Sequence, residues 1–132
     1  LVNETACGPD FYEEAKKSGH YIELDPAMSM EEAKEYANKM DVLYTDTWVD
    51  MEFFNNPAYQ KQKEETLAKM MPYQLNGDFT KDSKAIVFHD MPMHVGFEIS
   101  QDVVDKNLDH ILDEAENRRH AEKAVMYTLL NS

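Results

Sequence analysis

The segment "AIVFH", residues 85–89, is the feature of this sequence that most limits the possible folds. Its apolar run shows no alternation with polar positions, which is typical of a strand covered on both faces in a parallel sheet. His89 and Asp90 follow where the apolar residues end, and ligands of open α/β sheets bind beyond the carboxyl ends of the strands. The run therefore predicts a parallel sheet with a functional loop that begins at His89.

Strand-like and helical segments alternate along the rest of the chain. Residues 20–24 ("HYIEL"), 41–45 ("DVLYT") and 108–112 ("LDHIL") are expected as further strands, and residues 2–7 ("VNETAC") as the end of another. Helices are expected at residues 10–19, at residues 30–40 behind a Ser29–Glu32 capping box, from Pro57 to about residue 71, and at the end of the chain. This order predicts an α/β fold, a Rossmann-like parallel sheet with helices on both faces.

A second polar loop, "TDTWVDMEFFNN", follows the expected strand at residues 41–45. Because the carboxyl ends of parallel strands meet at one edge of the sheet, it should lie beside the loop that begins at His89. It carries Asp46, Asp50 and Glu52 next to Trp48, and both carboxylates and aromatic faces attract cations. The two loops therefore predict one pocket for a cationic ligand.

The charge of the chain excludes several classes of partner. Asp and Glu number 26 against 13 Lys and Arg, a formal net charge of −13 that repels nucleic acid and anionic membranes. Arg118 and Arg119 are the only arginines, and the four glycines form no phosphate-binding motif. We therefore expect no nucleic-acid or membrane partner, and phosphate recognition must come from elsewhere.

Cysteine content and hydropathy bear on the compartment. Cys7 is the single cysteine, so neither an intrachain disulfide nor a cysteine-rich zinc site can form. The sequence has no apolar run of about 20 residues that could cross a bilayer, and residues 1–10 lack the pattern of a signal peptide. A cytoplasmic protein is expected.

The loop after residue 88 also allows a metal site. His89, Asp90 and His94 are ligands that suit zinc, manganese or iron, and would fit a metal-dependent hydrolase. Pro92 lies between the histidines and prevents the regular helix of the H-E-x-x-H zinc pattern. Structural histidines are the competing interpretation, and no metal is assigned.

Four segments carry a family resemblance: "YTDTWVDMEFF", "PYQLN", "FHDMPMHVGFEI" and "LDEAENRRHAEKAVMYTLL". In this order and spacing, over about residues 41–130, they resemble the second-substrate domain of the aspartate/ornithine carbamoyltransferase superfamily, nearest to its ornithine and putrescine enzymes. The preceding "DPAMSMEEAKEYANKMDVLYTD" looks like the helix and strand that lead into that domain's acidic loop. The resemblance implies that residues 1–132 are a partial C-terminal domain, which lacks its first strand and helix and the N-terminal carbamoyl-phosphate domain.

The same resemblance implies a reaction and roles for matching residues. The family transfers a carbamoyl group from carbamoyl phosphate to an amine, without a cofactor. Asp46, in the family's Thr-Asp-x-Trp setting, would contact an amino group of the acceptor, and His89 and Pro92 stand in its His-Cys-Leu-Pro turn beside the reacting groups. Arg118, in "EAENR", would point toward the carbamoyl oxygen. The chemistry agrees, since an attacking amine needs hydrogen-bond acceptors and the developing oxyanion needs a cation or donors. His89 and Arg118 are thus the predicted catalytic residues.

Departures from the family pattern bear on the acceptor. Asp50, Met51 and Glu52 stand where ornithine enzymes have Ser-Met-Gly in a swinging loop, and Asp90 replaces the cysteine after the histidine. Added carboxylates should repel the α-carboxylate of ornithine by about 1–4 kcal/mol and favour a diamine or another amine. The resemblance itself implies an amine or amino-acid acceptor, either ornithine-like or a diamine. The predicted acceptor-binding residues are Asp46, Asp50, Met51, Glu52, Asp90, Met91 and Pro92.

Three functions remain open from the sequence. The first is the acceptor-binding part of a longer, homotrimeric carbamoyltransferase that is inactive as this fragment. In that case the apolar stripe over residues 121–129 should pack on a surface outside the chain. The second is a non-catalytic amine-binding module of the same fold, and the third is the metal-dependent hydrolase.

Overall fold

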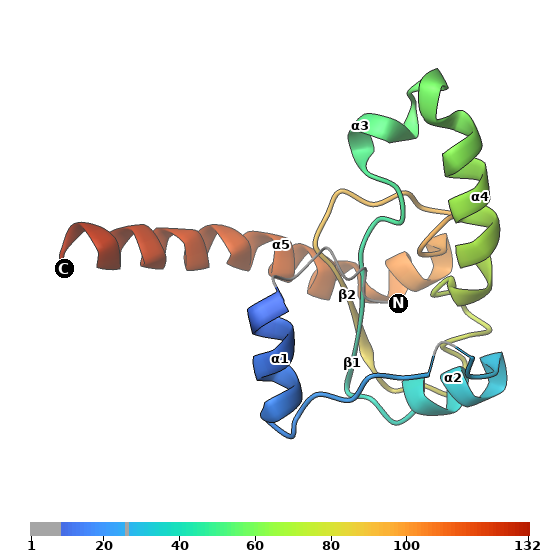
Figure 1. Cartoon of the computed structure of the whole chain (residues 1–132), viewed down its shortest axis with the longest axis horizontal. Coiled ribbons are helices and arrows are strands. Elements are labelled where there is room, and N and C mark those ends of the chain that lie inside the picture. The colour runs from blue at the N-terminus through green and yellow to red at the C-terminus, as the bar shows by residue number, and fades with distance from the viewer. Residues whose placement is uncertain (1–8, 26) are drawn as a thin grey trace.

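The computed structural model describes residues 9–25 and 27–132, which contain five α-helices, two 3-10 turns and two strands (Figure 1). The elements in chain order are α1 (Pro9–Lys17), α2 (Met30–Ala37), β1 (Val42–Thr45), α3 (Met51–Phe54), the 3-10 turn η1 (Pro57–Tyr59), α4 (Gln60–Met70), the 3-10 turn η2 (Met71–Tyr73), β2 (Ile86–His89) and α5 (Gln101–Leu130). The helices expected at residues 10–19, 30–40 and 57–71 and the strands expected at residues 41–45 and 85–89 are all present, with shifted ends.

Strands β1 and β2 form a parallel pair in which Val42 lies opposite Ile86 and Thr45 opposite His89. Figure 1 shows them side by side at the centre of the molecule, although they are separated by α3, α4 and the two turns in the sequence. The parallel α/β fold is therefore confirmed. Because both strands end at the same level, Asp46 and Asp90 leave the sheet at the same edge.

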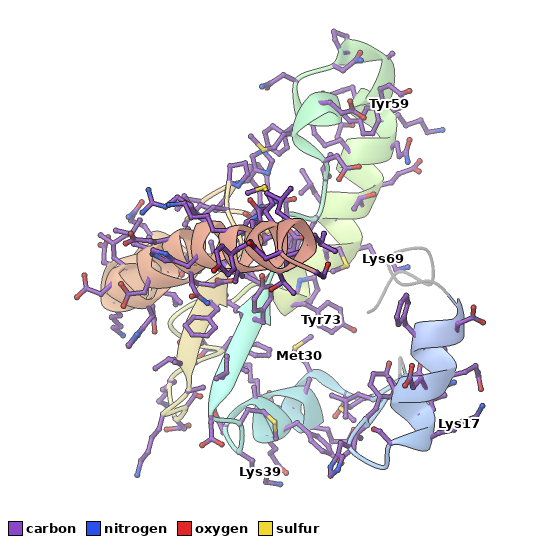
Figure 2. The ribbon with its side chains drawn as sticks, turned by 90° about the vertical axis from the view of Figure 1, so that its left-hand side faces the viewer. Lys17, Met30, Lys39, Tyr59, Lys69 and Tyr73 are labelled. Atoms are coloured by element: carbon purple, nitrogen blue, oxygen red, sulfur yellow. The ribbon has the colours of Figure 1, made fainter. Side chains whose placement is uncertain are left out.

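The hydrophobic core lies on one face of this pair. On β2, the side chains of Val87 and His89 are 1% and 0% exposed. On β1, Val42 and Tyr44 point away from the core and are 43% and 57% exposed. Met30 of α2 points toward the core, and Lys17 at the end of α1 points into solvent (Figure 2). The buried apolar residues are Ala37, Leu75, Phe79, Val87, Ile99, Val103, Val104 and Ile111.

Helix α5 closes the outer edge of β2. The backbone N–H of Val87 points away from β1 and donates to Oδ1 of Asn107 at 3.0 Å, while Nδ2 of Asn107 donates to the carbonyl of Val103 at 2.9 Å. One side chain thus satisfies a strand donor that would otherwise be unpaired. Val103 and Ile111, two turns apart, pack on the core from the same helix.

Two of the expected strands are wrong. Residues 108–112 lie within α5, because Val104 and Ile111 follow the helical period and bury one face of the helix. Residues 20–24 are not a strand, because no strand lies beside them in the described residues, and Ile22 and Leu24 are 76% and 42% exposed. The strand end expected at residues 2–7 lies outside the described residues.

Helix α2 begins as the sequence predicts. The Ser29 side chain accepts from the Glu32 N–H at 3.3 Å, and the Glu32 carboxylate accepts from the Ser29 N–H at 2.9 Å. This capping box satisfies two donors at the start of the helix.

The second half of α5 projects away from the rest of the chain (Figure 1). Val125 and Leu129 on this part are 58% and 71% exposed, so the apolar stripe packs against nothing in the described residues. That it covers a surface outside the chain stays a prediction. Among the described helices, none combines the length and apolarity needed to span a membrane.

Candidate functional site

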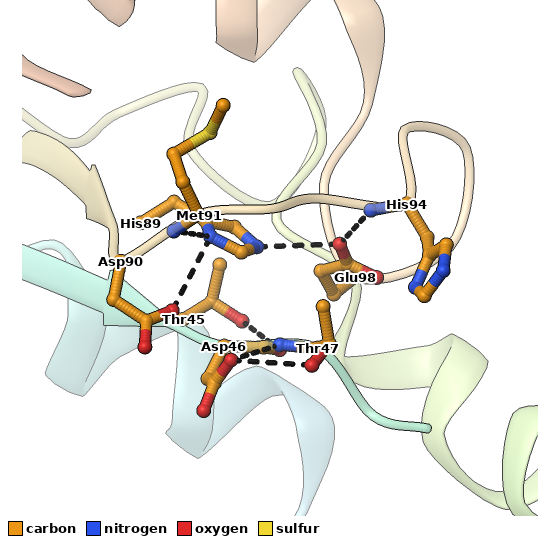
Figure 3. Close-up of polar contacts among 8 residues, drawn as sticks. All are labelled: Thr45, Asp46, Thr47, His89, Asp90, Met91, His94 and Glu98. Carbon is orange, nitrogen blue, oxygen red and sulfur yellow. Dashed lines mark hydrogen bonds and ion pairs between the residues drawn. The ribbon is translucent and has the colours of Figure 1, made fainter. Parts of the chain in front are cut away.

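Asp46 and Asp90 lie together at the carboxyl ends of the two strands (Figure 3). Asp46 is exposed, and its Oδ1 accepts from the N–H of Thr47 at 2.6 Å and from the Thr47 hydroxyl at 3.3 Å. These bonds hold the Asp46 carboxylate against the next residue of the loop.

Asp90 is electrostatically strained by its neighbours. Its side chain is 39% exposed, and Oδ1 is buried without a hydrogen-bond partner among the described residues. Burial, and next the neighbouring Asp46 carboxylate, raise the pKa of Asp90 above its ordinary value. A cation placed between the two carboxylates would relieve this repulsion, so the arrangement suits an ammonium group.

A third carboxylate reaches this edge from α5. Partial burial and the nearby Glu114 carboxylate raise the pKa of Tyr44, and Glu114 also acts on Asp90. One oxygen of Glu114 is buried without a partner among the described residues. Sequence reasoning missed Tyr44 and Glu114, although Tyr44 lies on β1 two positions before Asp46 and Glu114 lies within the "DEAENR" segment. The edge is therefore more acidic than the two loops alone predict.

An open hollow of about 450 Å³ continues this acidic surface between β2 and the middle of α5. Its lining residues are Phe88, His110, Asp113, Glu114, Glu116, Asn117 and His120. Its three carboxylates and the Phe88 ring are again favourable for cations, and two histidines lie beside them.

His89 does not face solvent. Its ring is 0% exposed, and its Nδ1 accepts from the backbone N–H of Met91 at 3.0 Å. A nitrogen that accepts carries no proton, so Nε2 carries it and donates to Oε1 of Glu98 at 3.2 Å. Both ring nitrogens of the neutral imidazole are therefore occupied within the chain.

The predicted metal ligands His89, Asp90 and His94 do not form a metal site in the described residues, although Nδ1 of His89 lies 3.6 Å from Oδ1 of Asp90. Neither ring nitrogen of His89 has a free lone pair, and the described residues contain no cluster of three or more His, Cys, Asp or Glu arranged to hold a metal ion. The hypothesis of a metal-dependent hydrolase thus finds no support in the structure.

The loop after β1 is attached to the turn after β2 through aromatic side chains. Asp50, Met51 and Glu52 are exposed at the start of α3, while Phe54 at its end stacks on His94 with 3.7 Å between ring centroids. Nζ of Lys63 lies 4.8 Å from the Phe54 ring centroid and donates to the Phe54 carbonyl at 2.8 Å. Sequence reasoning missed this contact, because neither residue's spacing indicates it.

The remaining predicted site residues are placed differently. Met91 packs against the core, and Figure 3 shows its side chain directed away from Asp46, while Pro92 is exposed in the same turn. Arg118 lies on the projecting half of α5, where its side chain is 67% exposed and Nε donates to Glu122 at 3.3 Å. The structure does not bring Arg118 to the strand ends, and its catalytic role stays a prediction.

Comparisons with known proteins give a consistent result. Residues 2–129 match the family model for the aspartate/ornithine carbamoyltransferase Asp/Orn binding domain. An ornithine carbamoyltransferase of Methanospirillum hungatei is 33% identical over 130 residues, which cover 97% of this chain and 39% of the relative. One from Chlorobaculum tepidum is 40% identical over 99 residues, which cover 74% of this chain and 28% of the relative. The chain thus spans less than two-fifths of the length of these relatives.

A solved structure shows the same fold. The anabolic ornithine carbamoyltransferase of Campylobacter jejuni superposes with a TM-score of 0.73 and 28% sequence identity. The superposition covers 94% of this chain and 39% of that one.

Proposed function

Because this chain belongs to the aspartate/ornithine carbamoyltransferase family, through the Asp/Orn binding domain, we propose that it is the acceptor-binding part of a carbamoyltransferase. The reaction transfers the carbamoyl group of carbamoyl phosphate to an amine. The single observation that carries the proposal is the pairing of Asp46 and Asp90 at one edge of a parallel sheet. Ligands of such sheets bind at this edge.

The proposed chemistry requires a neutral amine. Its lone pair attacks the carbonyl carbon of carbamoyl phosphate, the bond from that carbon to the phosphate oxygen breaks, and phosphate leaves with the electron pair. Asp46 accepts a hydrogen bond from an N–H of the amine and so directs the nitrogen lone pair at the carbonyl carbon. The proton that the amine loses passes to a carboxylate or to the leaving phosphate. Arg118 is proposed to stabilise the developing oxyanion in the complete protein.

We propose an acceptor without an α-carboxylate, such as a diamine, in place of ornithine, which carries a carboxylate beside its two amino groups. Asp90, whose pKa is raised beside Asp46, gains most from a cation, and Asp50 and Glu52 add exposed negative charge on α3. An α-carboxylate at this edge would meet only like charges, at a cost of about 1–4 kcal/mol. Met91 and Pro92 contribute through the backbone of their turn.

The carbamoyl phosphate site is proposed to lie outside these residues. The net charge of −13 and the two arginines do not suit a dianionic phosphate. We propose that the complete protein is a cytoplasmic homotrimer that contains a carbamoyl-phosphate domain, and that residues 1–132 alone do not catalyse transfer.

One observation favours a second candidate, an amine-binding module without catalysis. His89 is buried with both ring nitrogens occupied, and Arg118 pairs with Glu122 away from the strand ends. Neither predicted catalytic side chain then reaches a bound amine in this arrangement. Binding of an amine without transfer would identify this function.

The test uses the complete protein in which this chain occurs. Carbamoyl phosphate labelled with ¹⁴C is incubated with amine acceptors, and labelled carbamoylamine is measured. Loss of a hydrogen bond to a charged group costs about 1.5–3 kcal/mol, so Asp46→Asn should lower kcat/KM for the amine about 10–100-fold. Asp82→Asn, at an exposed carboxylate in the segment before β2, is the matched control and should change nothing. Absence of labelled product with every amine would refute the proposal.

A further inference from the structure

Glu98 is a buried acid that the proposed function does not use. Its side chain is 1% exposed, and Oε1 accepts from Nε2 of His89 at 3.2 Å and from the backbone N–H of His94. Oε2 has no partner among the described residues. Burial of a carboxylate costs free energy unless hydrogen bonds compensate for the lost water. The contacts of Glu98 with His89 and His94 therefore indicate a structural role for this side chain.

The two contacts of Glu98 span the turn that follows β2. His89 is the last residue of the strand and His94 follows the turn, so one carboxylate holds both of its ends (Figure 3). The other ring nitrogen of His89 accepts from the N–H of Met91 inside the turn. A chain of hydrogen bonds therefore runs from Glu98 through His89 to the backbone beside Asp90.

The turn needs such support. Met91 has a φ of 56°, a left-handed conformation that residues other than glycine rarely adopt. It persists only where neighbouring groups hold it, and the N–H of Met91 is held by His89. Loss of the His89 orientation would therefore release the backbone that positions Asp90 and Pro92.

Glu98 itself is anchored by the core. The Leu75 N–H donates to the Glu98 carbonyl at 3.0 Å, and the Ser100 N–H donates to the Leu75 carbonyl at 3.0 Å. Leu75 and Ile99 are 7% and 0% exposed, so the backbone on both sides of this bridge is fixed by packing. The position of the carboxylate is thus set by the interior of the protein and is independent of any ligand.

We propose that Glu98 is a positioning residue, which fixes the neutral Nε2–H form of His89 and, through it, the turn that presents Asp90 to the acceptor. The effect of Glu98 on acceptor binding rests on the proposed function, whereas its effect on the His89 ring does not. Glutamine keeps an acceptor oxygen at the same reach, and alanine removes it. Glu98→Gln should therefore preserve the turn, and Glu98→Ala should release it.

The first test is the tautomer of His89, measured by ¹⁵N NMR of the ring nitrogens. The wild type and Glu98→Gln should show the proton on Nε2, and Glu98→Ala should show a mixture of both tautomers. If Glu98→Ala does not fold, Glu98→Asp, whose carboxylate is one methylene shorter, replaces it with the same expectation. A pure Nε2–H signal in a folded Glu98→Ala or Glu98→Asp variant would overturn the proposal.

The second test is the kinetics of the complete protein. Misplacement of a binding group by about 1 Å can cost about 100-fold, so Glu98→Ala should lower kcat/KM for the amine about 10–100-fold, chiefly through KM. KM for carbamoyl phosphate should stay constant in Glu98→Ala. For Glu98→Gln, kcat/KM for the amine should remain within about threefold of the wild-type value. The control Glu65→Ala, at an exposed glutamate of α4, should have the wild-type kcat/KM. Equal loss for both substrates, or equal loss in Glu98→Gln, would contradict the positioning role. If the wild type transfers nothing, the proposed function fails while the tautomer still tests Glu98.

Discussion

The ring of Phe54 stacks on the imidazole of His94 with 3.7 Å between centroids and 12° between planes. This contact joins the end of α3 to the turn after β2, so the two loops that carry the acidic residues of the site are fixed to each other. Phe97 adds an edge-on contact to Phe54 at 5.4 Å. The loop bearing Asp50 and Glu52 is thus attached to the sheet edge and not free in solvent.

Removal of this stack should loosen the loop. Phe54→Ala loses a half-buried ring and an aromatic pair, so the free energy of unfolding should fall by about 1–3 kcal/mol. Urea unfolding measures the change, and acrylamide quenching of Trp48, the only tryptophan, reports the loop directly. Phe11→Ala, at a ring that is 72% exposed on α1, is the control and should stay within about 0.5 kcal/mol. Equal effects of both substitutions on stability and on quenching would show that the stack does not hold the loop.

Asp90 should make stability depend on pH. Because burial and Asp46 raise the pKa of Asp90 in the folded state, the unfolded chain loses this proton first as the pH rises. The folded state is therefore favoured below the ordinary carboxyl pKa and loses this contribution as the pH rises through the higher, folded value. Relative to the wild type, Asp90→Asn should become increasingly stable over that interval.

Urea unfolding of the wild type and Asp90→Asn between about pH 3.5 and 7 measures this difference. Asp82→Asn, at an exposed site, should show a difference that does not change with pH. A constant difference for Asp90→Asn as well would mean that the carboxylate is not strained in the folded protein.

Asn107 should be important for the edge of β2. Asn107→Ala leaves the N–H of Val87 without a partner in a partly buried place, so the free energy of unfolding should fall by about 1–3 kcal/mol. Asn131→Ala, just beyond the end of α5, supplies the control. If the two variants have the same urea midpoint, solvent replaces Asn107 at this edge.

The start of α2 gives a smaller effect. Ser29→Ala removes the cap that accepts from Glu32 N–H, and loss of such a cap costs about 0.5–2 kcal/mol. Thermal unfolding should show a lower Tm than for the wild type, and Ser132→Ala at the chain end should not. An unchanged Tm for Ser29→Ala would show that α2 forms without its capping box.

The sequence predicted those parts of the fold whose signal is local. The apolar run before His89 places β2, the Ser29–Glu32 pair places α2, and the level ends of the strands bring Asp46 next to Asp90. Residues 108–112 were misassigned because a short apolar segment fits a strand and a helix equally well. Its true state depends on Val104 and Ile111, which show a helical face only when the whole of α5 is considered.

The fine structure of the site depends on contacts that are remote in sequence. Phe54 meets His94 across 40 positions, and the burial of His89 depends on Glu98 and on the Leu75 bridge behind it. Nothing in the spacing of these residues reveals that both nitrogens of His89 are occupied. For the same reason the sequence suggested a metal ligand where the structure shows an imidazole with both nitrogens hydrogen-bonded, and the catalytic role of His89 stays a prediction.

The most direct test of the account is the acceptor preference of the complete protein. The measurement is the ratio of kcat/KM for 1,4-diaminobutane to that for ornithine, with carbamoyl phosphate saturating, in the wild type and in Asp90→Cys. Charge repulsion of about 1–4 kcal/mol corresponds to at least about a fivefold preference for the diamine, and Asp90→Cys should reduce it. A wild-type ratio below one, with ornithine as the better acceptor, would contradict the claim that the Asp46–Asp90 pair selects against an acceptor with an α-carboxylate.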